Sequence, residues 1–439
     1  MSAAALIGLA LVLGGCSSNS NNDAANTGNS AATDDAATNG GSNANSGKDS
    51  SSHSNADTGT RDDGGTGDSS DAHEPAADDR GDSPAVPEKG EASQYDDSKP
   101  GQLTAGEWDD AIAWKAWVRL LESGEGRDNQ SYWSMFPQNR LEVDVTAGGK
   151  PVSDATVTLS GGDGETVWEA RTDNKGVAYA YAGMFDEQGA QEKYGIAVTF
   201  GGQTKRFENV PVPRGEALKV ELEKPVKAAD ALDLMLLVDT TGSMKDELDY
   251  LKTELKDVVK RVDRDNGQQL GIRVSANFYR DRNDEYVVRA FPFTGDIEKV
   301  EDQLAEQDAA GGGDFPEAVD EALANAIEKH DWSDEARARL LFLVMDAPPH
   351  HDRKVTKRIQ ALTEEAAAEG IRIVPIASSG VDVNTEYLMR FIASATGGTY
   401  LFLTDHSGIG NDHLEPAVGE YEVKALNDLL VEVINRYAA

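Results

Sequence analysis

The sequence is poor in features that mark several common protein classes. Its 439 residues include one cysteine, Cys16, which excludes an intrachain disulfide and a CxxC metal or redox site. Lys and Arg number 41 against 78 Asp and Glu, a net charge of −37, and no basic run stands out. A nucleic-acid partner is therefore not expected. The sequence also lacks a catalytic-triad pattern, a P-loop and a glycine-rich dinucleotide fingerprint.

Long apolar runs are missing except at the start of the chain. Residues 3–13 are apolar but too few to cross a bilayer, which takes about 20 residues. Their number fits the core of a signal peptide. The sequence LGGC that ends at Cys16 resembles the bacterial lipobox. The resemblance implies a lipoprotein signal peptide over residues 1–16, with acyl chains on Cys16 as a membrane anchor. The alternative is a buried helix that happens to carry a cysteine.

Residues 17–102 contain almost no large aliphatic side chains and are rich in Asn, Ser, Asp, Gly, Ala and Thr. Such a segment cannot bury enough apolar surface to offset its chain entropy, so we expect a disordered linker. Its reach would grow as roughly 5–6 Å times the square root of its length. We expect it to hold the folded part away from the membrane, at the outside of a bacterial cell envelope.

Residues 103–138 are predicted to be helical and are rich in tryptophan. Thr104 and Glu107 have the spacing of a capping box. One apolar stripe follows at helical spacing: Trp114, Trp117, Val118 and Leu121. We favour packing of this stripe on the next domain. The alternative is an aromatic platform with which a surface protein would bind a glycan.

Residues 139–225 change to a period of two, with seven or so short strands separated by Gly, Asn and Asp turns. This pattern predicts an all-β sandwich of about 85 residues. The sequences GKPVSDATVTL and TDNKGVAYA resemble the carboxypeptidase-regulatory-like and bacterial Ig-like modules of surface proteins. Such a resemblance implies a fold and says almost nothing about a ligand.

Residues 230–439 alternate between strands and helices, which predicts a doubly wound, Rossmann-like α/β domain. The chain is therefore predicted to be multidomain. The expected strands are 232–239, 270–279, 285–293, 340–346, 371–377 and 399–403, and the expected helices are 243–265, 296–307, 315–330, 353–369, 384–396 and 422–437. The link between the second and third strands is too short for a crossover helix, so the third strand should be antiparallel at an edge.

Two of these strands end at an acidic residue. The apolar run that begins at Leu232 stops at Asp239, and the run 341–345 stops at Asp346. Ligands of open α/β sheets bind at such strand ends. Thr241 and Ser243 follow Asp239 in a D-x-T-x-S pattern, so a carboxylate and two hydroxyls can converge. These hard oxygen donors suit Mg²⁺, Mn²⁺ or Ca²⁺, and two neighbouring acids need a cation or a shared proton.

Three sequence motifs, together with the strand order, resemble the von Willebrand factor A domain and its metal-ion-dependent adhesion site. They are DTTGSM at 239–244, GGGDFPEAV at 311–319 and MDAPPHHD at 345–352. The resemblance implies that Thr241 and Ser243 touch the metal and that Asp239 acts through water. It also implies a second aspartate, at Asp346.

The second motif departs from the family pattern, in which that loop supplies a threonine. Gly313 takes its approximate place and Asp314 follows, so Asp314 is the candidate ligand. The resemblance implies a Mg²⁺ ion, or Mn²⁺ or Ca²⁺, with an open position that an exposed Asp or Glu of a protein partner fills. The possible contact residues around that position are Thr240, Gly313 and His350.

Simpler roles exist for some of these residues. Ser243 could cap the helix that follows it, and Asp314 with Glu317 could cap another, with a proline in its first turn. The adjacent His350 and His351 could suggest a transition-metal site, but we expect them to be solvated.

We expect a lipid-anchored, non-catalytic protein for adhesion or assembly. An enzyme is the alternative from another class, because DTTGS resembles the DKTGT loop of aspartyl-phosphate phosphotransferases, in which the first aspartate is the nucleophile. However, Thr240 replaces the lysine of that loop, and no acid follows Asp346 within four residues.

Overall fold

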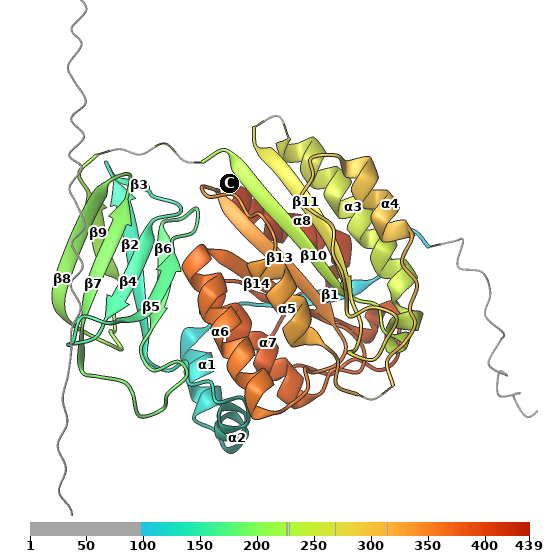
Figure 1. The fold of residues 1–439 in the computed structure, drawn as a ribbon, viewed down its shortest axis with the longest axis horizontal. Coiled ribbons are helices and arrows are strands. Elements are labelled where there is room, and N and C mark those ends of the chain that lie inside the picture. The colour runs from blue at the N-terminus through green and yellow to red at the C-terminus, as the bar shows by residue number, and fades with distance from the viewer. Residues whose placement is uncertain (1–97, 225–226, 228, 268, 314) are drawn as a thin grey trace, which may run out of the picture. The chain divides into compact units, whose positions relative to one another are not determined.

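A computed structural model describes the chain from residue 98 onward (Figure 1). The described residues are 98–224, 227, 229–267, 269–313 and 315–439. The predicted signal peptide, Cys16, most of the linker 17–102 and Asp314 therefore lie outside them. Within these ranges, no helix is long and apolar enough to cross a bilayer.

An eight-stranded sheet organises the C-terminal half, in the order β12-β11-β10-β13-β14-β15-β1-β16. Five neighbouring strands are parallel: β11 (Gly271–Tyr279), β10 (Ala231–Asp239), β13 (Ala338–Met345), β14 (Ile371–Ala377) and β15 (Tyr400–Leu403). The edge strand β12 (Val288–Arg289) is antiparallel and shorter than expected. The doubly wound α/β prediction is confirmed for this half of the chain.

Helices cover both faces of this sheet (Figure 1). One face packs against α3 (Leu248–Asn266), α4 (Ile297–Ala305) and α8 (Leu426–Ala438), and the other against α5 (Val319–Glu328), α6 (Arg353–Glu369) and α7 (Val383–Thr396). Side chains of β10 alternate between the two cores: Leu234 and Leu236 join the first, and Met235 and Leu237 the second. A strand that is buried on both faces explains the continuous apolar run.

The prediction of a helix from Thr104 is wrong. Residues Thr104–Trp108 form strand β1, which lies antiparallel between β15 and β16 (Lys424–Ala425). At Gly106 an added Cβ would lie 2.5 Å from the ring of Phe402, so the glycine lets the strand approach that ring. The helices begin later, with α1 (Trp114–Leu121) and α2 (Gly124–Trp133).

The segment before β1 is held by a buried carboxylate. Glu254 of α3 accepts hydrogen bonds from the backbone N–H groups of Gly101, Gln102 and Leu103, at 2.7–3.1 Å. The last residues of the predicted linker are therefore part of the folded structure.

The tryptophan-rich segment packs on the α/β part. Trp117 and Trp133 are each 1% exposed. Arg390 of α7 lies 4.3 Å from the Trp117 ring and forms buried ion pairs with Asp110 and Glu386, at 2.8 and 2.9 Å. This arrangement fits the packing interpretation better than an exposed aromatic platform.

Between β1 and β10, the chain forms two four-stranded sheets. The first has the order β3-β2-β6 with β9 beside β2, and the second has the order β5-β4-β7-β8. Their strands are β2 (Arg140–Ala147), β3 (Lys150–Pro151), β4 (Thr156–Ser160), β5 (Thr166–Arg171), β6 (Val177–Tyr181), β7 (Lys193–Phe200), β8 (Gln203–Pro211) and β9 (Leu218–Leu222). The relation of this part to Ig-like or carboxypeptidase-regulatory-like modules stays a prediction.

This two-sheet part is joined to the α/β part by apolar and charged contacts. Buried residues of both sheets belong to the same apolar cluster as side chains of α6 and α7. The Tyr181 hydroxyl donates to the backbone oxygen of Ser394 at 2.9 Å. Arg339 of β13 forms a 2.9 Å ion pair with Asp154, and both side chains are buried.

Candidate metal centre

Two carboxylates meet at the carboxyl edge of the large sheet. Strands β10 and β13 are parallel neighbours, with Val238 opposite Val344. Asp239 ends the first strand, and Asp346 follows the second by one residue. Both side chains are buried, at 0% and 3% exposure. The structure thus brings together the two acids that the sequence places at strand ends.

The D-x-T-x-S residues converge as the spacing predicts. Oδ1 of Asp239 accepts hydrogen bonds from the backbone N–H and the hydroxyl of Thr241, at 2.8 and 2.7 Å. The hydroxyls of Thr241 and Ser243 lie 3.1 Å apart, and Ser243 is exposed. Ser243 lies in the short 3-10 helix η1 (Gly242–Asp246), not at a helix N-cap, so the capping interpretation of this residue is wrong.

Three buried carboxylate oxygens around Asp239 have no hydrogen-bond partner within the described part of the chain: Oδ2 of Asp239, Oδ1 of Asp346 and Oε2 of Glu317. A fourth such oxygen, Oδ1 of Asp246, lies in the neighbouring η1. A buried, unpaired carboxylate oxygen is costly, so such groups normally bind a proton, a cation or water. These hard oxygen atoms, with the two hydroxyls, form a donor set that fits Mg²⁺.

Glu317 is the functional candidate that the sequence analysis missed. It is 2% exposed, and its backbone N–H donates to Pro348 O at 2.9 Å. An added Cβ at Gly312 would lie 3.1 Å from Oε1 of Glu317 and 3.3 Å from Cβ of Thr241. The predicted capping role is wrong, because α5 begins only at Val319.

Without a cation, this cluster favours bound protons. Burial, and then the charge of Asp346, raise the pKa of Asp239. Burial also raises the pKa of Asp346. The pKa of Glu317 is raised to about 9, by burial first and then by Asp239. The three groups therefore repel one another when ionised, and a cation would relieve that repulsion.

Carboxylates alone would not complete a metal site here. Among the residues that the structure describes, no three His, Cys, Asp or Glu side chains come close enough to hold a metal ion by themselves. The hydroxyls of Thr241 and Ser243, and water, would have to supply further ligands, as Mg²⁺ readily accepts. The predicted ligand Asp314 is outside the described residues.

A glycine loop lies against the D-x-T-x-S residues. The N–H of Gly242 donates to Gly311 O at 3.1 Å, and the N–H of Gly312 donates to Oδ2 of Asp284 at 2.9 Å. Gly311 and Gly312 have φ values of +79° and +66°, a backbone conformation that favours glycine. These contacts explain why the GGG sequence suits this position.

The predicted contact residues differ in accessibility. Gly313 is exposed, and an added Cβ there would meet nothing within 4 Å. Thr240, in contrast, is fully buried, and its hydroxyl bonds to Tyr279 O at 3.0 Å and to the Tyr286 hydroxyl at 2.7 Å. Its side chain therefore does not reach a partner, contrary to the prediction.

The expectation that both histidines are solvated is wrong for His350, which is half-buried, whereas His351 is exposed. Nε2 of His350 lies 2.7 Å from Oδ1 of the buried Asp281. The ring of His351 stacks on Tyr132 with centroids 3.7 Å apart. Both partners are distant in sequence, so a local polar context could not reveal them.

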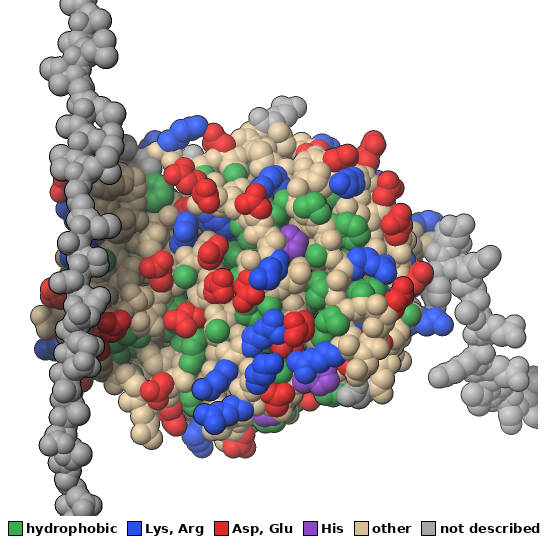
Figure 2. All heavy atoms as spheres, in the orientation of Figure 1, with side chains coloured by type: hydrophobic (Ala, Val, Ile, Leu, Met, Phe, Trp, Pro, Cys, Tyr) green, Lys and Arg blue, Asp and Glu red, His purple; other side chains and the backbone are tan. Residues whose placement is uncertain are grey.

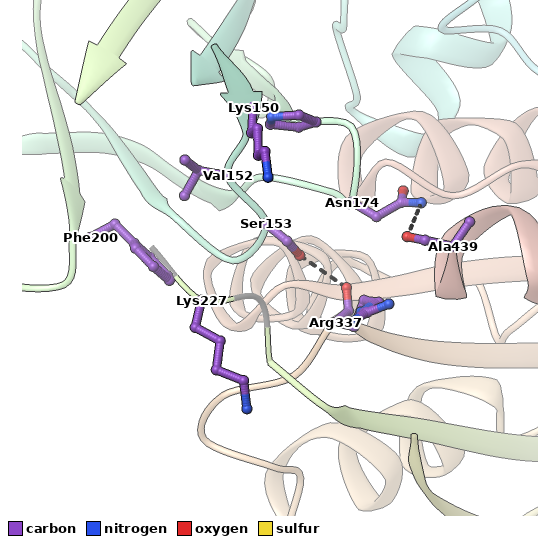
Figure 3. A pocket seen from close by; sticks show the side chains of 9 residues that line it. Lys150, Val152, Ser153, Asn174, Phe200, Lys227, Arg337 and Ala439 are labelled. Atoms are coloured by element: carbon purple, nitrogen blue, oxygen red, sulfur yellow. Dashed lines mark hydrogen bonds between the residues drawn. The ribbon is translucent and has the colours of Figure 1, made fainter. Parts of the chain in front are cut away.

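A cavity of about 300 Å³ lies at the other edge of the sheet, before β13 begins (Figure 3). Two of its three basic side chains are already engaged: Lys227 pairs with Asp230 at 2.7 Å, and Nε of Arg337 donates to Ala229 O at 3.2 Å. The Arg337 oxygen accepts from the Ser153 hydroxyl (Figure 3). Ligands of open α/β sheets bind at the carboxyl edge instead, so this cavity is a weaker candidate.

Comparison with known proteins matches the C-terminal half. A family model described as "von Willebrand factor A domain" matches residues 233–405. A putative ariadne-like RING finger protein of Acanthamoeba polyphaga mimivirus is 27% identical over 189 residues, which are 39% of this chain and 18% of that protein. The crystal structure of the conserved hypothetical protein BatB from Bacteroides thetaiotaomicron is 15% identical, with a TM-score of 0.33, and the match covers 47% of this chain and 98% of that one.

Proposed function

Since residues 233–405 form a von Willebrand factor A domain, we propose that this chain binds a divalent cation at the carboxyl edge of the large sheet. Asp239 and Asp346 supply carboxylates, Thr241 and Ser243 supply hydroxyls, and Glu317 adds negative charge beside them. Asp314, three residues before Glu317 in the sequence, is a further candidate ligand. Mg²⁺ is the best candidate, with Mn²⁺ and Ca²⁺ as the alternatives.

One observation carries this proposal: three buried carboxylate oxygens lie at this edge without a hydrogen-bond partner in the described residues. Capping roles do not account for them, because α3 and α5 begin without a side-chain cap. Two hydroxyls lie beside the carboxylates, as a hard cation with few charged ligands requires.

We further propose that the bound cation holds an acidic group of a protein partner. Hydroxyl ligands donate little charge, so the cation stays attractive to an Asp or Glu at an open position. Ser243 and Gly313 are exposed beside the cluster, which leaves the centre accessible from solvent. The role is one of adhesion or assembly and is non-catalytic.

The predicted lipid anchor completes this proposal. Cleavage before Cys16 and acylation of its thiol would hold the chain on a membrane of a bacterial cell envelope, with the A domain facing outward. Metabolic labelling with a palmitate analogue should modify the chain, and Cys16→Ser should abolish the label.

Calorimetric titration of the full chain with Mg²⁺, Mn²⁺ and Ca²⁺ tests the metal centre. We expect binding that Asp239→Ala and Asp346→Ala each weaken by at least about tenfold, because a removed carboxylate leaves the cation underneutralised. Asp144→Ala changes an aspartate of β2 and serves as the matched control. The absence of binding by the unaltered chain, or equal binding by all variants, would refute the centre.

An enzyme is the less favoured of two alternatives, and in it Asp239 would act as a phosphoryl acceptor. The enzyme hypothesis predicts that the unaltered chain hydrolyses a phosphate ester and that Asp239→Asn abolishes this activity. Our proposal predicts no such activity in either protein. The glycan-binding alternative is disfavoured by the burial of Trp117 and Trp133.

A further inference from the structure

Unpaired cations gather on α6 although the chain as a whole carries a charge of −37. Arg353, Lys354 and Lys357 are exposed in the first turns of this helix. Their side chains have no ion pair or hydrogen bond to any residue that the structure describes. We call these three residues the α6 cation patch. Figure 2 shows Lys and Arg side chains gathered over α6.

The α6 cation patch lies at the same edge of the sheet as the candidate metal centre. The chain passes from Asp346 at the end of β13 to Asp352, which caps α6. The Asp352 carboxylate accepts from the N–H groups of Lys354 and Val355, at 2.7 and 3.0 Å. Pro348, in the same connection, accepts the N–H of Glu317, so the connection also contacts the centre.

Neighbouring arginines are neutralised, which sets the patch apart. Arg282 and Arg358 both pair with Asp320, at 3.0 and 3.3 Å. Arg358 also pairs with Glu321 at 2.7 Å. The charges of these four side chains compensate one another. The α6 cation patch forms no such ion pair with any described residue, although the charge of Lys354 acts on the carboxylates of Glu321 and Asp352.

Helix stability does not explain the position of the α6 cation patch. The N-terminus of a helix carries partial positive charge, so cations there are unfavourable by a few tenths of a kcal/mol each. The first turn of α6 contains no acidic residue, and its last turn no basic one. The Asp352 cap stabilises this helix end, but the three cations oppose the helix dipole, so helix stability does not account for them and their position points to a role in binding.

An exposed aromatic side chain lies in the glycine loop of the centre. Phe315 is 50% exposed, and it comes two residues before Glu317. It is one of four large hydrophobic residues exposed in the described part of the chain. A protein segment could cover this ring, whereas a simple inorganic anion could not.

We propose that the α6 cation patch and Phe315 are the second half of the partner-binding surface, and that the partner is an acidic protein segment with an apolar residue. One acid of that segment reaches the cation, others face the α6 cation patch, and the apolar side chain covers Phe315. This inference rests on the proposed function, because it extends the surface around the same centre.

Charge complementarity selects this partner. The acidic remainder of the chain repels an acidic segment, so such a segment is favoured only where unpaired cations lie. Contacts of this kind mainly raise the association rate, and salt weakens them. Binding should therefore depend on both the divalent cation and ionic strength.

Two separate measurements on the full chain test this inference. Calorimetry with Mg²⁺ reports the centre alone. Fluorescence anisotropy reports the partner surface, with a short labelled peptide of glutamates that contains a central leucine. We expect peptide binding in Mg²⁺, its loss in EDTA, and its loss with a peptide of serines in place of the glutamates.

The test variant is Arg353→Glu/Lys357→Glu, which reverses two charges one helical turn apart. Its matched control is Lys115→Glu/Arg119→Glu, an exposed pair at the same spacing in α1. We expect the test variant to lose at least about tenfold in peptide affinity, because its two introduced glutamates would repel the glutamates of the peptide. Mg²⁺ affinity should stay unchanged in both variants. Phe315→Ser should lower the affinity for the leucine-containing peptide more than the affinity for an all-glutamate peptide.

The outcomes separate the two proposals. If Mg²⁺ does not bind the unaltered chain, the proposed function fails. If Mg²⁺ binds but both charge-reversal variants hold the peptide as tightly as the unaltered chain, the further inference fails alone. Binding to vesicles rich in phosphatidylglycerol, without binding to the peptide, would also overturn it, since the partner would then be a membrane.

Discussion

At the scale of single residues, the carboxyl edge of the large sheet brings together buried carboxyl groups that repel one another when they are ionised. Asp239, Asp346 and Glu317 are buried together, and each keeps one oxygen without a hydrogen-bond partner among the described residues. Ionised carboxylates in such a place are destabilising unless a proton or a cation compensates them. This local conflict is the physical reason to expect a ligand at this edge.

The first prediction concerns the pH dependence of stability in EDTA. The pKa values of Asp239, Asp346 and Glu317 are raised in the folded state, the last to about 9 from a usual 4.5. The folded state therefore binds more protons than the unfolded state across this range. Stability should be highest at low pH and should fall as pH rises through the raised values.

The measurement is the urea midpoint between about pH 5 and about pH 9, with and without Mg²⁺. We expect the midpoint in EDTA to decrease toward high pH and Mg²⁺ to reduce that decrease. A midpoint in EDTA that is constant or rises would contradict the repulsion within the cluster.

The second prediction concerns Glu317→Gln, which removes the charge while keeping the shape. At about pH 8 in EDTA, this variant should be more stable than the unaltered chain by at least about 1 kcal/mol. Glu317, with its pKa raised to about 9, must take up a proton on folding at this pH, whereas glutamine needs none. Its affinity for Mg²⁺ should fall. Glu335→Gln, at an exposed position, is the control for urea unfolding and calorimetry. A loss of stability in Glu317→Gln would mean that the carboxylate makes a favourable contact.

At the scale of elements, β1 is the unexpected strand of the large sheet. It fills the position between β15 and β16. Its residue Ala105, and Leu103 just before it, are part of the core on the α3 and α8 face. The sheet that begins with β10 in sequence is thus completed by a strand from more than a hundred residues earlier. A fragment that begins at residue 230 lacks one interior strand of this sheet.

The third prediction follows from that position. A fragment of residues 230–439 should melt at a lower temperature than a chain that begins at residue 98, and should associate, because β15 becomes an unpaired edge. Circular dichroism measures the melting temperature, and size-exclusion chromatography measures the association state. Equal melting temperatures and a monomeric fragment would show that β1 is dispensable.

The parallel strands and most helices of the α/β part could be predicted from sequence because apolar runs and helical periodicity are local signals. Strand β1 could not, since Thr104 and Glu107 have the spacing of a helix cap, while the partners of the strand lie near residues 400 and 425. At the site, Asp239 and Asp346 were found because buried strands stop there. Glu317 was missed, because only the folded loop brings it beside Thr241.

At the scale of the whole molecule, the two-sheet part and the α/β part share buried contacts. Arg339 forms an ion pair with Asp154, and Tyr181 bonds to Ser394. Side chains of both parts belong to one apolar cluster. We therefore expect the two parts to unfold together rather than as independent domains.

The fourth prediction tests this coupling. Arg339→Met should destabilise the chain by about 3 kcal/mol. It leaves the buried carboxylate of Asp154 with the more distant Arg171 as its only described ion-pair partner, and with one hydrogen bond from the N–H of Ala336. Asp154→Asn/Arg339→Met should recover part of the loss, since asparagine tolerates the φ of 65° at this position. Calorimetric melting measures both, and an Arg339→Met melt identical to that of the unaltered chain would contradict the coupling.

The order of the chain decides how a mechanical load would travel. Residues 98–103 are fastened to α3 by Glu254 and lead directly into β1, whereas the two-sheet part branches off between β1 and β10. A pull on the N-terminal side would therefore strain the sheet that carries the candidate metal centre first. The two-sheet part does not lie between the pulled N-terminal side and the large sheet. It would therefore carry little of the load and could not act as an extensible spacer for the α/β part.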